Sequence, residues 1–210
     1  MTRIKICGIK TLQEAQAAVE AGVDMLGFNF YPKSRRYLAL KTCTDLVATI
    51  SSRWPAVRLV GVFVNSSIAD IQSALAVTGL HLAQLSGDEP AQALAVLGQY
   101  AFKALRPQDR AALQAALAQY PPRQSPPAFL VDANRPGEFG GTGATADWEL
   151  ARDLAGRVPI LLAGGLTPEN VRAAIEQVNP WGVDVASGVE SAPGVKDIRK
   201  MQQFVRQARQ

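Results

Sequence analysis

The sequence contains few of the side chains on which many enzymes and secreted proteins depend. It has 2 cysteines and 1 histidine among 210 residues. Two cysteines exclude the disulfide framework of a small secreted domain. Histidine and aspartate nowhere stand at a spacing typical of a metal site. We therefore expect a protein that holds no metal and uses no cofactor.

Long apolar runs and blocks of like charge are also absent. No stretch approaches the roughly 18 uninterrupted apolar residues that a membrane-spanning helix needs, and the first residues, MTRIKI, do not form a signal peptide. The net charge of +4 is spread along the chain, without the basic stripe typical of nucleic-acid-binding proteins. We expect a cytoplasmic protein that binds no nucleic acid and no membrane. Its mild positive charge is compatible with a small anionic substrate.

Short apolar segments alternate with longer alanine-rich segments along the whole chain. The apolar segments predict eight strands: Arg3–Cys7, Asp24–Phe30, Arg58–Val64, His81–Leu85, Ala101–Leu105, Ala128–Val131, Pro159–Ala163 and Gly182–Ala186. The segments between them have helical spacing and predict eight helices: Leu12–Ala21, Thr42–Ser51, Ile68–Val77, Ala91–Leu97, Gln108–Gln119, Asp147–Ala155, Pro168–Val178 and Lys196–Ala208. Several strands are apolar almost without interruption, which is typical of parallel strands buried on both faces.

Eight strand–helix units of nearly equal length predict an α/β fold of one of two kinds. A (β/α)8 TIM barrel with eight parallel strands is favoured, because eight equal units close readily into a ring. A doubly wound open sheet uses the same alternation and is the alternative. The chain is too short for two comfortable domains, so we expect residues 1–210 to form a single catalytic barrel domain.

In a TIM barrel the active site forms at the carboxyl ends of the strands. The first predicted strand ends at Cys7, beside Gly8, and the sixth is followed by Asp132. Cys7 is either an inert buried thiol or a reactive one left open to approach by the glycine. Asp132 either caps the following turn or is a functional carboxylate. His81 begins its strand at the opposite face, so acid–base catalysis here would have to proceed without histidine.

Glycine-rich turns follow the seventh and eighth predicted strands. The first contains Gly164 and Gly165, and the second contains Ser187 and Gly188. Backbone N–H groups at such turns bind phosphate, and these two loops are the usual phosphate site of the TIM barrel. The alternative is that the glycines only make a tight turn, with Thr167 as the cap of the next helix.

Two further loops would border the same pocket. Gly141 lies in the loop after the sixth strand, within the segment GGTGATA at 140–146. This segment matches G-x-G-x-x-A but stands too far from the strand to bind a dinucleotide. We expect the loop to close over a substrate. The basic segment KSRR at 33–36 is either a solvated loop or an anion-binding one.

These motifs together resemble the phosphoribosylanthranilate isomerase family of tryptophan biosynthesis. The matching segments follow the family order over essentially the whole chain: KICGI (5–9), GVFVN (61–65), QLSGDE (84–89), VDA (131–133), GGTG (140–143), LAGGL (162–166) and GVDVASGVE (182–190). The resemblance implies an Amadori rearrangement of N-(5-phosphoribosyl)anthranilate to the corresponding 1-deoxyribulose 5-phosphate without a cofactor. A related phosphosugar isomerase or epimerase and a non-catalytic phosphate-binding protein are the alternatives.

The resemblance also implies roles for individual residues. It makes Cys7 the general base and Asp132 the general acid, places Arg36 at the anthranilate carboxylate and places Asp184 near the reacting sugar. An isolated carboxylic acid has a pKa of about 4 and a thiol about 8.5, so both groups would start in the wrong form at neutral pH. The family is compatible with a monomer or a homodimer.

The chain departs from the family pattern at three positions. Ser86 stands where the family usually has histidine, Arg35 where it has proline, and Ala146 where it has phenylalanine. These departures concern binding of the aromatic ring and loop closure more than the acid and the base.

Overall fold

A closed barrel of eight parallel strands forms the centre of the protein, in a computed structural model that describes residues 1–132 and 148–210. The strands are β1 (Arg3–Cys7), β2 (Met25–Asn29), β3 (Arg58–Phe63), β4 (Leu82–Leu85), β5 (Ala101–Leu105), β6 (Phe129–Val131), β7 (Ile160–Leu162) and β8 (Gly182–Val185). Strand β1 pairs in parallel with both β2 and β8, which closes the ring. The predicted TIM barrel is confirmed, and the open-sheet alternative is wrong.

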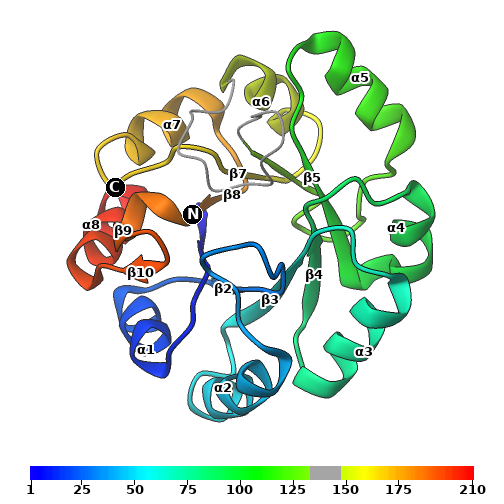
Figure 1. Cartoon of the computed structure of the whole chain (residues 1–210). Coiled ribbons are helices and arrows are strands. Elements are labelled where there is room, and N and C mark those ends of the chain that lie inside the picture. The colour runs from blue at the N-terminus through cyan, green and yellow to red at the C-terminus, as the bar shows by residue number, and fades with distance from the viewer. Residues whose placement is uncertain (133–147) are drawn as a thin grey trace.

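Helices surround the barrel as an outer ring (Figure 1). They are α1 (Leu12–Ala21), α2 (Leu40–Arg53), α3 (Ile68–Thr78), α4 (Ala91–Leu97), α5 (Arg110–Gln119), α6 (Trp148–Ala155), α7 (Val171–Val178) and α8 (Ile198–Arg209), with short 3-10 turns η1 (Gly98–Tyr100) and η2 (Ser187–Val189). Within residues 1–132 and 148–210, no helix has both the length and the apolar character needed to cross a bilayer. The ring closes where α8 returns to β1, since Arg209 donates to the carbonyl of Thr2 at 2.6 Å.

The alternation of side chains along each strand divides the core into two layers. In β1, Ile4 and Ile6 belong to the large apolar core shared with the helices. The next positions, Lys5 and Cys7, therefore point into the barrel. A separate apolar cluster fills the inside of the barrel: Met25, Val60, Leu82, Phe102, Ala104, Leu130, Leu161 and Ala163. Cys7 is the last residue of β1, so its side chain lies at the carboxyl end of the barrel, where a site can form.

The predicted bounds fail most clearly after β8. Helix α8 begins at Ile198 rather than at Lys196, because the preceding residues form a small antiparallel sheet of β9 (Glu190–Ala192) and β10 (Val195–Lys196). Gly194, with φ of 81°, supplies the turn. Asp197 then caps α8 by accepting from the N–H groups of Arg199 and Lys200. The sequence does not predict this sheet, because its strands are too short and polar to show a periodic pattern.

Helix α7 also begins later than predicted, at Val171 rather than Pro168. The residue before it is Asn170, whose side-chain oxygen accepts from the N–H of Thr167 at 2.8 Å. Thr167 is therefore not the cap of this helix, contrary to the alternative considered above. The predicted start of the sixth helix, Asp147, lies outside the described residues, as do Gly141 and Ala146.

Candidate active site

A pocket opens at the carboxyl ends of the barrel strands. Every predicted site residue in the described ranges lines it except Gly188. Gly141 lies outside those ranges. The lining residues are Cys7, Asn29, Ser34, Arg36, Val62, Gln84, Ser86, Asp132, Ala163, Gly164, Gly165, Leu166, Asp184, Val185, Ala186 and Ser187. A thiol from β1 and a carboxylate that follows β6 thus face one space, although they lie far apart in the sequence.

Two glycines set the surroundings of Cys7. A Cβ on Gly27 of the neighbouring strand would lie 3.0 Å from the Cys7 sulfur and 3.2 Å from Cε of Lys5. Gly8 has φ of 82°, and a Cβ there would meet the side chain of Arg36. The absence of side chains at these positions lets the thiol, the lysine stem and the arginine pack closely.

Burial and charge act in opposite directions on Cys7. The thiol is only 7% exposed, and burial raises its pKa above the ordinary value. The positive charges of Lys5, Lys196 and Arg36 lower the pKa, and Asp184 raises it. Burial outweighs the three cations, so the pKa of Cys7 lies above its ordinary value. The cations that a thiolate base would need are nevertheless in place.

A buried lysine lies beneath Cys7 on the inner face of β1. The Lys5 ammonium donates to Oδ1 of Asp184 at 2.8 Å and to Oε1 of Gln84 at 3.0 Å. Burial alone would lower the pKa of Lys5, but the charge of Asp184 and then that of Cys7 raise it above its ordinary value. Lys5 is therefore a permanent cation, and its partners compensate for its desolvation.

The same hydrogen-bond network includes Ser86, one of the three positions at which the chain departs from the expected pattern. Gln84 donates through Nε2 to the hydroxyl of Ser86 at 3.0 Å. Ser86 is buried and lines the pocket, and its carbonyl accepts from Nη2 of Arg106. A small buried side chain therefore lies at this point of the pocket wall, where the resemblance leads us to expect histidine. Arg35, the second departure, is exposed, and its backbone packs against Gly194.

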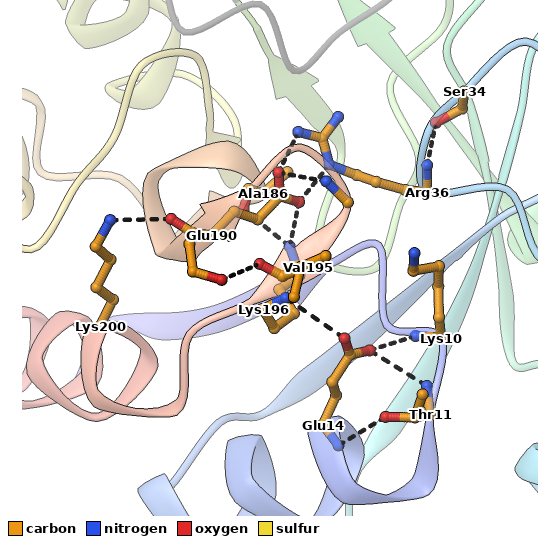
Figure 2. A network of polar contacts seen from close by, with 12 residues as sticks. Lys10, Thr11, Glu14, Ser34, Arg36, Ala186, Glu190, Val195, Lys196 and Lys200 are labelled. Atoms are coloured by element: carbon orange, nitrogen blue, oxygen red, sulfur yellow. Dashed lines mark hydrogen bonds and ion pairs between the residues drawn. The ribbon is translucent and has the colours of Figure 1, made fainter.

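Arg36 is mostly buried, with 14% of its side chain exposed, rather than solvated. Its Nε and Nη2 donate to the two carboxylate oxygens of Glu190 at 2.6 and 2.8 Å. Such a two-point pair fixes the plane of the guanidinium as well as its position. Glu190 also accepts from the ammonium of Lys196 at 3.0 Å. Figure 2 shows these three side chains converging from the loop after β2 and from the β9–β10 sheet.

The glycine turns after β7 and β8 meet each other at the edge of the pocket. Gly164 and Gly165 have φ of 88° and 67°, in a region that residues with a Cβ rarely adopt. A Cβ on Gly188 would collide with the backbone carbonyl of Leu166. Asn170 supports the first turn, since its Nδ2 donates to the carbonyl of Gly165 at 2.9 Å. The two turns form one continuous backbone surface next to Ser187.

Sequence reasoning missed Lys5, Gln84, Glu190 and Lys196. Lys5 carried a usable signal, because a charged residue at an inward position of an apolar strand needs a buried partner. Glu190 and Lys196 carried none, because their partners are set by a sheet that the sequence does not predict. Within residues 1–132 and 148–210, no group of histidine, cysteine and acidic side chains could hold a metal ion.

The amino-acid sequence is similar to those of known proteins over its full length. Residues 4–207 match the family model described as N-(5'phosphoribosyl)anthranilate (PRA) isomerase. The chain is 44% identical to N-(5'-phosphoribosyl)anthranilate isomerase of Geobacter metallireducens, covering 100% of both chains. It is 46% identical to the protein of the same name from Myxococcus xanthus, covering 99% of this chain and 96% of that one.

Solved structures agree with these relatives. The phosphoribosyl anthranilate isomerase of Thermotoga maritima superposes with a TM-score of 0.87 at 36% identity, covering 100% of this chain and 99% of that one. A phosphoribosyl anthranilate isomerase in complex with reduced 1-(o-carboxyphenylamino)-1-deoxyribulose 5-phosphate superposes with a TM-score of 0.84 at 34% identity, with the same coverage. The chain therefore belongs to the N-(5'-phosphoribosyl)anthranilate isomerase family.

Proposed function

We propose that this chain isomerises N-(5'-phosphoribosyl)anthranilate to 1-(2-carboxyphenylamino)-1-deoxyribulose 5-phosphate, a step of tryptophan biosynthesis. One observation carries the proposal. A thiol and a carboxylate line the same pocket, between a fixed arginine and a pair of glycine turns. The solved relative with a bound reduced 1-deoxyribulose 5-phosphate supports a substrate with a sugar phosphate and a carboxylate.

The substrate's two anionic ends have separate partners in this proposal. The phosphate binds to backbone N–H groups of the turns that contain Gly164, Gly165, Ser187 and Gly188, as phosphates do at glycine-rich loops. The anthranilate carboxylate binds Arg36 at the edge formed by Nη1 and Nη2, since Glu190 occupies the edge formed by Nε and Nη2. The sugar then lies between Cys7 and Asp132.

The reaction needs one acid and one base. Asp132 in its acid form protonates the ring oxygen of the ribose, and the bond between that oxygen and C1 breaks as the nitrogen lone pair forms a Schiff base. The Cys7 thiolate then removes the proton from C2, which gives an enolamine. The enolamine takes up a proton at C1 and loses the proton of its C2 hydroxyl, which gives the ketone. The product is an isomer of the substrate, so no oxidant or reductant is consumed.

Cys7 must lose its proton for this step, although burial favours the thiol. The nearby positive charges of Lys5, Lys196 and Arg36 stabilise the thiolate. Asp184 is bound to Lys5, and this pair lies directly below the proposed base. We therefore assign Asp184 a supporting role beside the reacting sugar, rather than a proton transfer of its own.

The same proposal places the protein in the cytoplasm, where a free thiol such as that of Cys7 stays reduced. The proposed site needs one chain only, which is compatible with a monomer or a homodimer. One solved relative is described as monomers generated from a dimeric isomerase. Light scattering of the purified protein measures which form this chain adopts.

Turnover of freshly prepared phosphoribosylanthranilate, followed by the loss of its fluorescence, tests the proposal. We expect activity without added metal or nucleotide. Cys7→Ser and Asp132→Asn should each lower kcat by at least about 100-fold while product-analogue binding is retained. Cys43→Ala is the matched control, because this second thiol is buried in α2 outside the pocket. Analogue binding without turnover by the wild type would favour a non-catalytic binding protein instead.

A further inference from the structure

Glu190 is a buried carboxylate to which the proposed reaction gives no role. It accepts four hydrogen bonds, from Nε and Nη2 of Arg36, from Nζ of Lys196 and from the N–H of Gly194. A carboxylate has about four acceptor positions, so Glu190 is saturated and cannot also bind substrate. Burial by itself would raise the pKa of Glu190, but Arg36 and Lys196 hold it below its ordinary value. The group is ionised throughout the neutral range.

The ion pair between Glu190 and Arg36 determines which edge of the guanidinium can bind a ligand. The edge formed by Nε and Nη2 faces Glu190. The edge formed by Nη1 and Nη2 is the one that can present two parallel N–H groups to a ligand carboxylate. Arg36, Lys196 and Glu190 together carry a charge of +1, so an anion is still attracted after the pair has formed.

Lys196 connects this pair to the β8 turn. Its ammonium, which is fully buried, donates to the carbonyl of Ala186 at 2.8 Å as well as to Glu190. Ala186 and Ser187 line the pocket and lead into the β8 turn. The Glu190 carboxylate therefore holds Arg36 directly and holds the β8 turn through Lys196.

The β9–β10 sheet that carries Glu190 and Lys196 is itself anchored on several sides (Figure 2). Lys200 of α8 donates to the carbonyl of Glu190 at 2.9 Å. The carboxylate of Glu14, at the start of α1, accepts from the N–H of Lys196 at 3.4 Å and from the N–H of Lys10 at 2.7 Å. The sheet is thus tied to the helices that flank the pocket and to the loop that follows Cys7.

We infer that Glu190, together with Lys196, is a positioning residue that sets the spacing between Arg36 and the β8 turn and thereby selects substrates with an anionic group at each end. The inference rests on the proposed function, because it takes Arg36 and the β8 turn as the two anion sites. Glu190 touches neither anion. It acts through Arg36 on the carboxylate end and, through Lys196, on the phosphate end.

Glu190→Gln is the most direct test, because the side chain keeps its shape and loses its charge. An amide presents N–H groups where Glu190 now presents an oxygen, so one of the bonds from Arg36 or Lys196 is lost. Two ligands are compared by titration: the reduced product analogue and the same compound without the aryl carboxylate. We expect binding of the first to weaken by about 10- to 100-fold, the range for loss of a charge-assisted hydrogen bond. Binding of the second should weaken less, because only its phosphate end depends on Glu190, through Lys196.

Three further variants make the test decisive. Glu190→Asp keeps the charge and should restore part of the preference for the carboxylate ligand. Arg36→Ala with Glu190→Gln should bind that ligand only slightly more weakly than Arg36→Ala alone, because the two changes remove the same contact at the carboxylate end and only the effect through Lys196 remains. Glu176→Gln is the matched control, since Glu176 forms an exposed pair with Arg172 on α7 and should change neither affinity.

Equal weakening of both ligands in Glu190→Gln would overturn the inference, because a general loss of structure does not distinguish them. Additive losses in the double variant would overturn it as well. Should Glu190→Gln not fold, Glu190→Asp gives the same comparison with a smaller expected loss. These measurements need binding only and not turnover. A wild type that binds both ligands but does not turn over phosphoribosylanthranilate would refute the proposed function. The binding data would still test the role of Glu190.

Discussion

Replacing Lys5 by methionine separates the structural role of this buried cation from its effect on Cys7. Methionine keeps the unbranched stem and removes the ammonium that pairs with Asp184 and Gln84. The carboxylate of Asp184 then stays in the barrel without its cation. Breaking a buried ion pair in this way lowers the free energy of unfolding by about 3–5 kcal/mol, against a total of about 5–15 kcal/mol for a typical domain. Urea unfolding measures the loss.

The double change Lys5→Met with Asp184→Asn distinguishes charge pairing from packing. Removal of both charges leaves no unpaired carboxylate, so most of the lost stability should return. The pKa of Cys7 should nevertheless remain higher than in the wild type. Lys5 lowers this pKa more strongly than Asp184 raises it. When both charges are removed, the rise in the Cys7 pKa that burial causes is therefore less compensated.

Alkylation of Cys7 by iodoacetamide as a function of pH reads this shift directly. Because only the thiolate reacts, a raised pKa moves the midpoint of the rate to higher pH in both Lys5 variants. Turnover should fall at neutral pH and recover as the pH rises. Cys43 serves as the internal control, since burial raises its pKa to about 12. An unchanged alkylation midpoint in Lys5→Met, or a double variant no more stable than the single one, would refute this reasoning.

Three other changes test separate parts of the structure. Arg36→Ala should raise KM by at least about 10-fold with a smaller change in kcat, because it removes an anchoring contact. Gly188→Ala should weaken competitive inhibition by ribose 5-phosphate, since the added methyl displaces the Leu166 carbonyl; unchanged inhibition would separate this turn from phosphate binding. Asp24→Asn should lower the free energy of unfolding at neutral pH by about 1–3 kcal/mol. Burial alone would raise the pKa of Asp24, but hydrogen bonds from Arg3, from the N–H of Ile4 and from Arg209 hold it below its ordinary value. Its contribution is therefore present above the unfolded-state pKa of about 3.9 and lost as the pH falls through the lower folded value; urea unfolding at several pH values checks this.

The barrel could be predicted from the sequence because its determinants are local and repeated. Apolar segments such as Arg58–Val64 mark strands that are buried on both faces, and eight of them alternate with helical segments. The bounds of β1 and α1 agree with the prediction to the residue. The prediction failed at 190–196, where Glu190 and Lys196 replace the apolar pattern with buried charge.

The site was predictable only in the parts that follow from strand direction. Cys7 and Asp132 were expected at the carboxyl ends of their strands, and both line the pocket. The pairing of Arg36 with Glu190 joins residues 154 positions apart, and that of Lys5 with Asp184 joins residues 179 positions apart. Neither pair has a spacing that a periodic pattern can reveal, because closure of the barrel brings the partners together.

The arrangement of charges bears on which of the two groups holds the proton. Moving one proton from Cys7 to Asp132 leaves the net charge of the pocket unchanged. The ratio of the two protonation forms therefore depends on the charges near each group. Lys5, Lys196 and Arg36 all favour the thiolate, but each is paired with a carboxylate that weakens its effect. Between the two pKa values the ratio of these forms does not depend on pH. A bell-shaped rate profile therefore gives the same two values for either assignment, and direct detection of the thiolate by alkylation distinguishes them.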